Sequence, residues 1–271
     1  MTDVRHERMV GRYGFGMFPI PRYREMRGGD WTLSLHRPGL GDGYSSGPLI
    51  EAPKFVLYQG RTAWMSTGLM ELESHAPHVD AARGLVAVAG FGMGLYTYTA
   101  AQKPEVERVV VVETDPSLIA LMQERGLFET WPNWEKVSIV TGDALDPDTW
   151  ARALQGRSPD YLYADIWPVC PHDLAPGQTR DMVAMAAPKR AGWWGQELSF
   201  GQWCGRRGRM PDRAALDDFF RESGVPWGAS TEGYAQFCAD VLALNPKLLK
   251  RVNEQVSGFW ATVRRLILPS A

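Results

Sequence analysis

The sequence predicts an α/β protein with a doubly wound, mostly parallel sheet and a small N-terminal β region that includes a lid. From residue 84 onward, short apolar runs alternate with segments of helical periodicity, as in successive βαβ units. Before that point, short strand-like segments are separated by turns rich in glycine and proline. We therefore expect a β appendage and lid over residues 1–80 and an α/β domain over residues 81–271.

Bulk composition excludes several classes of protein. The 271 residues carry a formal net charge of −2 with no long run of one sign, which predicts neither a nucleic-acid nor an anionic-membrane partner. No apolar run approaches the roughly 20 residues of a membrane helix, and the N-terminus lacks a signal-peptide core. The three cysteines are far apart and form no metal motif. We expect a cytoplasmic protein without a metal, and a homodimer is compatible with these observations.

The N-terminal region reads as a small antiparallel unit. Strands are expected at residues 31–36, 54–59 and 61–66, with a hairpin around Gln59 and Gly60. The polar first 30 residues are expected to form a mobile leader that acts as a lid, and a helix over residues 67–79 leads into the next unit.

In the second region, predicted strands and helices alternate along the chain. The residues Asp115 and Pro116 open one of its helices and Gly126 closes it. Strands are expected at 84–90, 108–113, 136–142, 160–166 and 192–200, and helices at 93–103, 115–126, 146–156, 179–189, 211–224 and 233–245.

A glycine loop follows the first strand of this region. The segment reads G-F-G-M-G, with Gly90, Gly92 and Gly94. Dinucleotide-binding loops have a third glycine where this chain has Leu95, so a ligand without a pyrophosphate is favoured. The loop backbone would then approach a sugar or an amino-acid chain. A tight strand-to-helix turn without any ligand remains the alternative.

Acidic residues stand at the ends of the next three strands. Glu113 can accept hydrogen bonds from both ribose hydroxyls, and Asp143 can accept one from an adenine amino group. Asp165 ends the fourth strand. A helix-capping role is the alternative for the first two. Because ligands of open α/β sheets bind at the carboxyl ends of the strands, we expect one nucleoside site there.

These motifs resemble those of the class I S-adenosylmethionine-dependent methyltransferases. The segments "VAVAGFGMG", "VVVVETD", "TGDAL" and "YADIWP" carry the resemblance, which covers roughly residues 84–200. It implies a Rossmann-like methyltransferase fold and bound S-adenosylmethionine, with Asp165 orienting the α-ammonium group or acting as a base. The implied cofactor-binding residues are Gly90, Phe91, Gly92, Gly94, Glu113, Thr114, Asp143, Ala144, Asp165 and His75.

The layout is also similar to that of the spermidine synthases, which carry a small N-terminal β domain before the same core. The segment "WMSTGLMELESHAPHV" resembles the one before their glycine loop, with Glu71 and His75 near ligand-facing positions. Those enzymes have a D-x-x-D-P pattern that binds a polyamine. This chain reads Asp165-Ile-Trp-Pro, with Trp167 before the proline, where those enzymes have the second aspartate. A tryptophan cannot neutralise a diamine, which argues against a polyamine acceptor.

Aromatic residues supply the candidates for substrate contact, because aromatic faces attract a cation such as a sulfonium. Core packing is the alternative for each of them. Asp165, Trp167 and Tyr163 are the predicted catalytic residues. The wider set of candidates is Tyr161, Tyr163, Trp167, Trp193, Trp194, Gln196, Glu197, Ser199 and Trp203.

Three functions fit these features. The first is a transferase that moves the methyl group of S-adenosylmethionine to a small molecule. The second is attack at the γ-carbon of its methionine chain with release of methylthioadenosine, either as cyclisation to azetidine-2-carboxylate or as aminopropyl-type transfer. The third is a non-catalytic S-adenosylmethionine binder.

Overall fold

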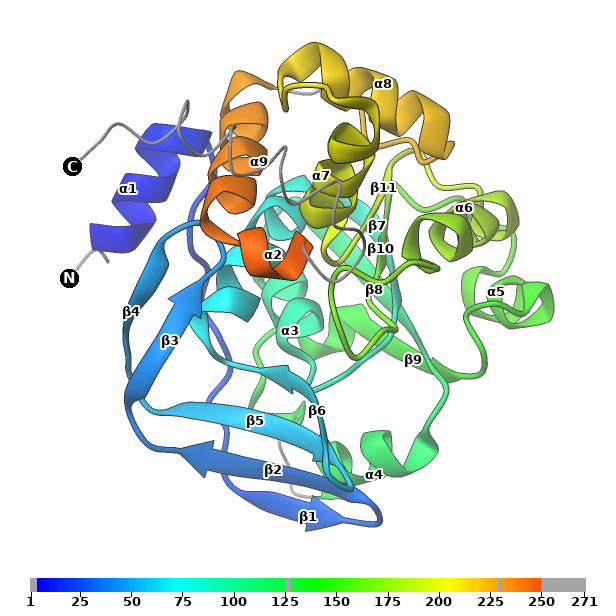
Figure 1. Cartoon of the computed structure of the whole chain (residues 1–271). Helices are drawn as coiled ribbons and strands as arrows, with labels where there is room; N and C mark the ends of the chain where they lie inside the picture. The colour runs from blue at the N-terminus through cyan, green and yellow to red at the C-terminus, as the bar shows by residue number, and fades with distance from the viewer. Residues whose placement is uncertain (1–3, 125–127, 229–230, 250–271) are drawn as a thin grey trace.

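The computed structural model describes residues 4–124, 128–228 and 231–249. Within them the chain forms a five-stranded sheet, a four-stranded sheet and a two-stranded ribbon. In Figure 1 the two smaller β units lie together at the lower left, beside the helix-covered five-stranded sheet. None of the helices in the described ranges has the length and apolar composition that crossing a membrane requires.

The five-stranded sheet is parallel throughout and confirms the predicted fold class. Its strand order is β11-β10-β7-β8-β9. The chain moves outward from β7 to β9 and then returns to place β10 on the other side of β7, so the direction of winding reverses between β7 and β10. The strands are β7 Gly84–Ala89, β8 Val106–Glu113, β9 Val137–Thr141, β10 Tyr161–Ala164 and β11 Ala191–Trp193.

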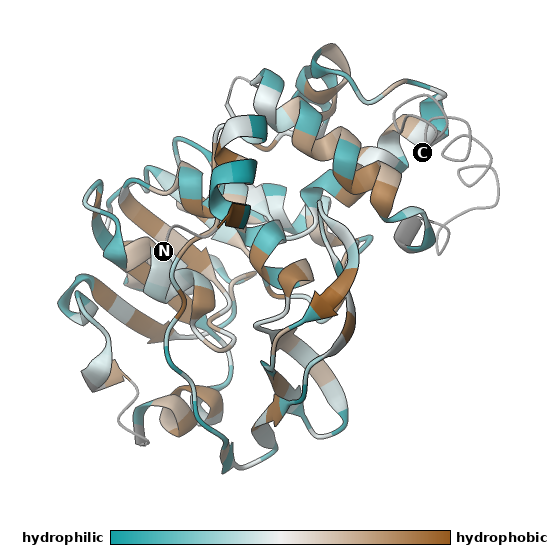
Figure 2. Cartoon of the chain, turned by 90° about the vertical axis from the view of Figure 1, so that its left-hand side faces the viewer, coloured by the Kyte–Doolittle hydropathy of each residue, from teal (hydrophilic) through white to brown (hydrophobic). Residues whose placement is uncertain are grey.

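Helices cover both faces of this sheet, which is why its strands are apolar without alternation. Alternate residues of β8 enter two separate cores: Val110 and Val112 belong to one, and Val109 and Val111 to the other. Figure 2 colours the chain by hydropathy and shows brown, apolar segments in both strands and helices. One core contains residues of α3 Leu95–Gln102 and α4 Pro116–Glu124, and the other contains residues of α5 Pro147–Leu154 and α6 Ala175–Ala186.

The N-terminal β region pairs strands in the order β1-β2-β5-β6, all antiparallel. The expected hairpin is confirmed, with Gln59 opposite Thr62 and Gly60 in a left-handed conformation at the turn. A β3–β4 ribbon was not expected, since its glycine-rich sequence reads as a turn. The elements are β1 Met26–Gly28, β2 Trp31–His36, β3 Gly39–Gly43, β4 Gly47–Glu51, β5 Lys54–Gln59, β6 Thr62–Ser66 and α2 Leu69–Ala81.

The expectation of a mobile leader is wrong for residues 4–13, which form helix α1 (Val4–Tyr13). This helix packs on α9 (Glu232–Leu244), as Figure 1 shows at its upper left. The Tyr13 hydroxyl and the Arg12 guanidinium both donate to the buried Asp240 carboxylate, at 2.7 and 2.5 Å. The polar, arginine-rich sequence did not suggest this helix, which buries Met9 and Tyr13.

A second correction concerns residues 192–200, which were expected to be one strand. Strand β11 ends at Trp193, and Gly195 turns the chain with a φ of 78° into helix α7 (Gln196–Arg207). The aromatic pair in "GWWG" favoured a longer strand than the glycine permits. Helices α8 Arg213–Ser223 and α10 Pro246–Leu249 complete the C-terminal layer, while the expected helix end at Gly126 lies outside the described residues.

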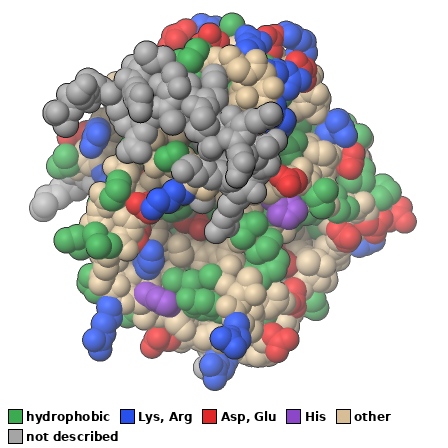
Figure 3. Space-filling model, in the orientation of Figure 1, with side chains coloured by type: hydrophobic (Ala, Val, Ile, Leu, Met, Phe, Trp, Pro, Cys, Tyr) green, Lys and Arg blue, Asp and Glu red, His purple; other side chains and the backbone are tan. Residues whose placement is uncertain are grey.

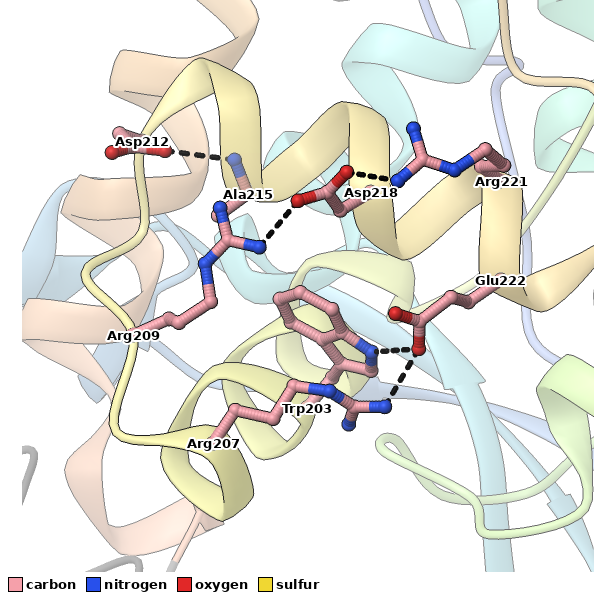
Figure 4. Close-up of polar contacts among 8 residues, drawn as sticks. All are labelled: Trp203, Arg207, Arg209, Asp212, Ala215, Asp218, Arg221 and Glu222. Atoms are coloured by element: carbon pink, nitrogen blue, oxygen red, sulfur yellow. Dashed lines mark hydrogen bonds and ion pairs between the residues drawn. The ribbon is translucent and has the colours of Figure 1, made fainter.

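Charges on the outer helices are paired locally. Arg207 lies over the ring of Trp203 at 4.5 Å and donates to Glu222, while Arg209 pairs with Asp218 (Figure 4). On the face in Figure 3, positive and negative side chains are interspersed outside the grey region. The arginines of this cluster are therefore bound within the fold.

We predict that Gly90→Ala destabilises the protein by about 2–4 kcal/mol. Gly90 has a φ of 91°, and an added Cβ would lie 2.1 Å from the carbonyl oxygen of Asp165. Gly11→Ala in α1 is the control, because its Cβ would meet nothing within 4 Å, and we expect it to stabilise by up to about 1 kcal/mol. Urea unfolding measures both, and equal stability of Gly90→Ala and the parent would contradict the geometry.

Candidate functional site

A cavity of about 470 Å³ opens where the winding direction of the parallel sheet reverses. Ligands of open α/β sheets bind at this position, beyond the carboxyl ends of the strands. One wall comes from the loops after β7, β8, β9 and β10, and the other from the N-terminal sheet. The lining residues are Trp31, Leu57, Gln59, Trp64, Met65, Gly90, Gly92, Val112, Glu113, Thr114, Asp115, Pro116, Leu118, Gly142, Asp143, Ala144, Asp165, Ile166 and Trp167.

The glycine loop forms the floor of this cavity. Gly90 fits only because it lacks a Cβ facing the Asp165 carbonyl. Gly92, with a φ of 55°, lies under the Met65 sulfur, which a Cβ would approach to 2.8 Å. Gly94 precedes α3 in a left-handed conformation, and Leu95 is fully buried. At each of these three positions a side chain would clash with its neighbours, which explains the glycines, and Gly90 and Gly92 border the cavity.

The Glu113 carboxylate holds the loop in place. One oxygen accepts the backbone N–H of Phe91 and the other accepts that of Asp115, both at 2.8 Å. The Phe91 ring points into the core against Phe128 and Trp131, so only its backbone serves the site. Each carboxylate oxygen can accept a further hydrogen bond. Glu113, which lines the cavity, can thus fix the loop and still bind a ligand.

The next strand end contributes Asp143 and Ala144. One Asp143 oxygen accepts the backbone N–H of Leu145 at 2.8 Å, which closes a local turn. The carbonyl of buried Ala144 accepts the indole N–H of Trp150 at 2.7 Å. Both residues line the cavity, together with Thr114 from the neighbouring strand end. The second oxygen of Asp143 is available to a donor in the cavity.

Asp165 forms the deep end of the cavity. Its Oδ2 lies 3.4 Å from Nε2 of His75, and Glu71 stands one helical turn before His75 on α2. Burial raises the pKa of Glu71 to about 8, although adjacent His75 favours the ionised form. Burial lowers the pKa of the His75 ring, but the nearby carboxylates of Asp165 and Glu71 have the larger, opposite effect, so the His75 pKa is raised overall. Asp165 is thus the cavity-facing member of a buried polar group.

Trp167 lines the cavity beside Asp165, as its predicted role requires. Its indole N–H donates to the side chain of Gln178 on α6 at 2.7 Å, which fixes the ring. Tyr163 and His75 do not border the cavity but lie behind Asp165, where their ring centroids are 5.6 Å apart. Burial raises the pKa of the Tyr163 hydroxyl well above its usual value.

Other sequence candidates lie in the core. Trp193 packs against Phe219 and Phe220, and the Tyr161 hydroxyl bonds to His78. The predicted aromatic wall therefore does not include Trp193, Trp203 or Tyr161. Trp194 lines a second cavity of about 330 Å³ that shares Trp64 and Met65 with the first. Gln196, Glu197 and Ser199 are buried in α7, and Trp203 packs under Arg207 and Arg209.

The sequence did not reveal the aromatic residues that do line the cavity. Trp31 and Trp64 come from the N-terminal sheet and pack edge to face, 6.0 Å apart. The Trp31 indole donates to Asp115 at 2.8 Å, which joins this sheet to the end of β8. The cavity lining in the described ranges begins at Trp31, and its N-terminal wall comes from residues 31–65.

The cavity is strongly acidic. Among the described residues that line it, Glu113, Asp115, Asp143 and Asp165 are acidic, and none is lysine, arginine or histidine. Low-dielectric walls strengthen the field of such a cluster. The site therefore favours a cationic ligand and disfavours a pyrophosphate.

Comparisons with known proteins give likenesses of fold. No family model matches the sequence, and no curated protein matches it. Partial structural matches include a dimethyladenosine transferase from Plasmodium falciparum, with 18% identity, 47% of this chain and 42% of that one covered, and a TM-score of 0.31. An rRNA methyltransferase, aviRa, from Streptomyces viridochromogenes matches with 16% identity, 42% and 65% coverage and a TM-score of 0.30.

A spermidine synthase from Thermotoga maritima matches with 13% identity, 63% of this chain and 65% of that chain covered, and a TM-score of 0.35. The chain thus spans between 42% and 65% of the length of these three structures. At these identities the likeness concerns the fold alone.

We predict that Glu197 makes the protein less stable as pH rises from about 4.5 to about 7. Burial raises its pKa to about 7, against hydrogen bonds from Tyr234 and Tyr44 that lower it. The folded state therefore holds this proton more tightly than the unfolded state, and the stabilisation is lost as pH rises through the folded pKa.

Glu197→Gln should remove this loss. Its stability relative to the parent should improve across that range by up to about 3 kcal/mol, at about 1.36 kcal/mol per pKa unit. Unfolding curves at several pH values measure the difference, with Glu232→Gln at an exposed position as control. A pH-independent difference would contradict the assignment.

Proposed function

We propose that this protein is an S-adenosylmethionine-dependent transferase that acts on a small molecule. The observation that carries the proposal is the acidic cavity at the reversal point of a parallel sheet. S-adenosylmethionine is a nucleoside with a sulfonium, an ammonium and one carboxylate group, so it is a net cation. A dinucleotide would instead bring a pyrophosphate toward four carboxylates.

The residues present fit this ligand. A volume of about 470 Å³ lies within the range of about 300–1,000 Å³ for small-molecule sites. Glu113 would accept the ribose hydroxyls through the lone pairs that the loop leaves free, and Asp143 would accept the adenine amino group. The backbone at Gly90 and Gly92 would approach the methionine portion, because no side chain intervenes there.

The reacting end would lie at Asp165 and Trp167. Asp165 can accept the proton that a nucleophile loses as it forms its new bond to carbon, with the bonding electrons of the broken C–S bond passing to sulfur. The Trp167 ring, held by Gln178, offers a face to the sulfonium. Trp31 and Trp64 exclude water from the opposite side.

Transfer of the methyl group to a separate acceptor is the reaction we favour. The second cavity, which shares Trp64 and Met65 with the first, offers space for an acceptor. Attack at the γ-carbon is the second candidate, because the wall that the N-terminal sheet gives to the first cavity carries no charged side chain to bind an amine acceptor. Within that candidate, cyclisation to azetidine-2-carboxylate needs no acceptor at all.

We expect the protein to bind S-adenosylmethionine, and Glu113→Ala to weaken binding by about 1.5–3 kcal/mol through lost charge-assisted hydrogen bonds. Glu107→Ala is the matched control, since Glu107 is exposed on the same strand, far from the cavity. Isothermal titration calorimetry measures both variants. Unchanged affinity in Glu113→Ala would show that the ribose is not bound there.

Incubation with S-adenosylmethionine alone and with candidate acceptors, read by mass spectrometry, identifies the bond that breaks. Methyl transfer leaves S-adenosylhomocysteine and requires an acceptor. Methylthioadenosine formed without an acceptor would contradict methyl transfer and support cyclisation. Binding of S-adenosylmethionine with no product under any condition would indicate a non-catalytic binder.

We predict that Trp167→Ala slows turnover by about 2- to 30-fold, which corresponds to a cation–π contribution of about 0.5–2 kcal/mol. Trp167→Phe keeps an aromatic face and should retain most of the activity. The turnover number is measured at saturating S-adenosylmethionine. Equal rates for the alanine variant and the parent would remove Trp167 from the reacting end.

A further inference from the structure

A buried group of potential ligands lies behind the cavity. Glu71 and His75 stand one turn apart on α2, and Asp165 follows β10. Their ligand atoms all lie within 4.8 Å of one another. Glu71 and His75 are buried, and the Asp165 side chain is 14% exposed. An acidic cluster alone would not indicate a bound ion, so the state of the imidazole decides what the group can hold.

The hydrogen bonds of His75 define its free nitrogen. Nδ1 lies 2.8 Å from the carbonyl oxygen of Glu71, and since a carbonyl can only accept, Nδ1 carries a hydrogen. In the neutral ring, Nε2 is then a lone pair, fully buried and without a hydrogen-bond partner. It faces the Asp165 carboxylate, so two acceptors confront each other unless a proton or another cation lies between them.

The distance between these two atoms leaves room for a cation. A charge-assisted N–H···O bond would bring nitrogen and oxygen to about 2.7–2.9 Å. The observed separation of Nε2 and Oδ2 is 3.4 Å. That value is the edge of a tetrahedron whose centre lies about 2.1 Å from each ligand, the bond length of zinc to imidazole and carboxylate.

The surroundings match a metal site in two further respects. Metal-binding histidines commonly donate their other N–H to a backbone carbonyl, as Nδ1 does here. The Tyr163 hydroxyl is also buried without a partner and belongs to the same ring cluster as His75. Glu71 can complete the set by rotation about its broad terminal torsion, since its carboxylate already lies within 4.8 Å of the other two ligand atoms.

We propose that Glu71, His75 and Asp165 bind a divalent transition-metal ion of the zinc class, with an open coordination position toward the cavity. This revises the expectation of a metal-free protein. The position opens toward the cavity because Asp165 lines it. An acceptor that carries an oxygen or nitrogen lone pair could bind the ion there. The inference concerns the chain alone and does not depend on S-adenosylmethionine.

Metal binding is tested on the full chain after dialysis against a chelator. Titration calorimetry with Zn²⁺, without S-adenosylmethionine, should give one equivalent bound. His75→Gln and Asp165→Asn should each weaken it by at least about 100-fold, more than the 10- to 100-fold typical of losing an outer partner. His36→Gln, the same change at an exposed histidine on β2, should retain the parental affinity.

Co²⁺ bound in place of Zn²⁺ gives a test that needs no substitution, because its visible spectrum reports tetrahedral coordination by nitrogen and oxygen. Circular dichroism confirms that each variant is folded. The proposal is overturned if the parent binds no stoichiometric Zn²⁺, if His75→Gln binds as tightly as the parent, or if His36→Gln abolishes binding. If NMR showed a protonated His75 in the presence of excess Zn²⁺, a proton and not a metal ion would lie between His75 and Asp165, which would also overturn the proposal.

Discussion

The backbone contact between Gly90 and Asp165 is the constraint on which the site depends. Strands β7 and β10 are neighbours, and the chain leaves them in opposite directions around the sheet. A Cβ at position 90 would lie 2.1 Å from the Asp165 carbonyl oxygen, so only glycine lets both strand ends meet. Their divergence opens the cavity, and the next two strands deliver Glu113 and Asp143 to the same edge.

Helix α2 buries four ionisable side chains, those of Glu71, Glu73, His75 and His78. Burying so many ionisable groups is costly unless each has a partner or a task. Glu73 accepts from the backbone of the β3–β4 turn, and His78 bonds to the Tyr161 hydroxyl on β10. These two tie the sheets together, while Glu71 and His75 face Asp165. One helix thus joins the N-terminal region to the cavity.

Sequence reasoning succeeded where local pattern determines the outcome. Strand ends in a βαβ series meet at one edge, so the grouping of Gly90, Glu113, Asp143 and Asp165 followed from their order in the chain. It failed where packing of distant segments decides. Nothing near Trp31 signals that its indole donates to Asp115, which follows β8. The glycine-rich sequence of the β3–β4 ribbon and the arginine-rich sequence of α1 likewise did not predict a strand pair and a helix, because tertiary contacts stabilise both elements.

The central claim is that the acidic cavity binds the adenosyl and amino-acid portions of S-adenosylmethionine across the ends of β7, β8 and β9. A crystal structure of the protein with S-adenosylhomocysteine tests this most directly. We expect the ribose hydroxyls to donate to the Glu113 carboxylate and the adenine amino group to donate to Asp143. The amino-acid chain should lie over Gly90 and extend toward Asp165. A ligand bound elsewhere, or with its adenine at the Asp165 end, would contradict it.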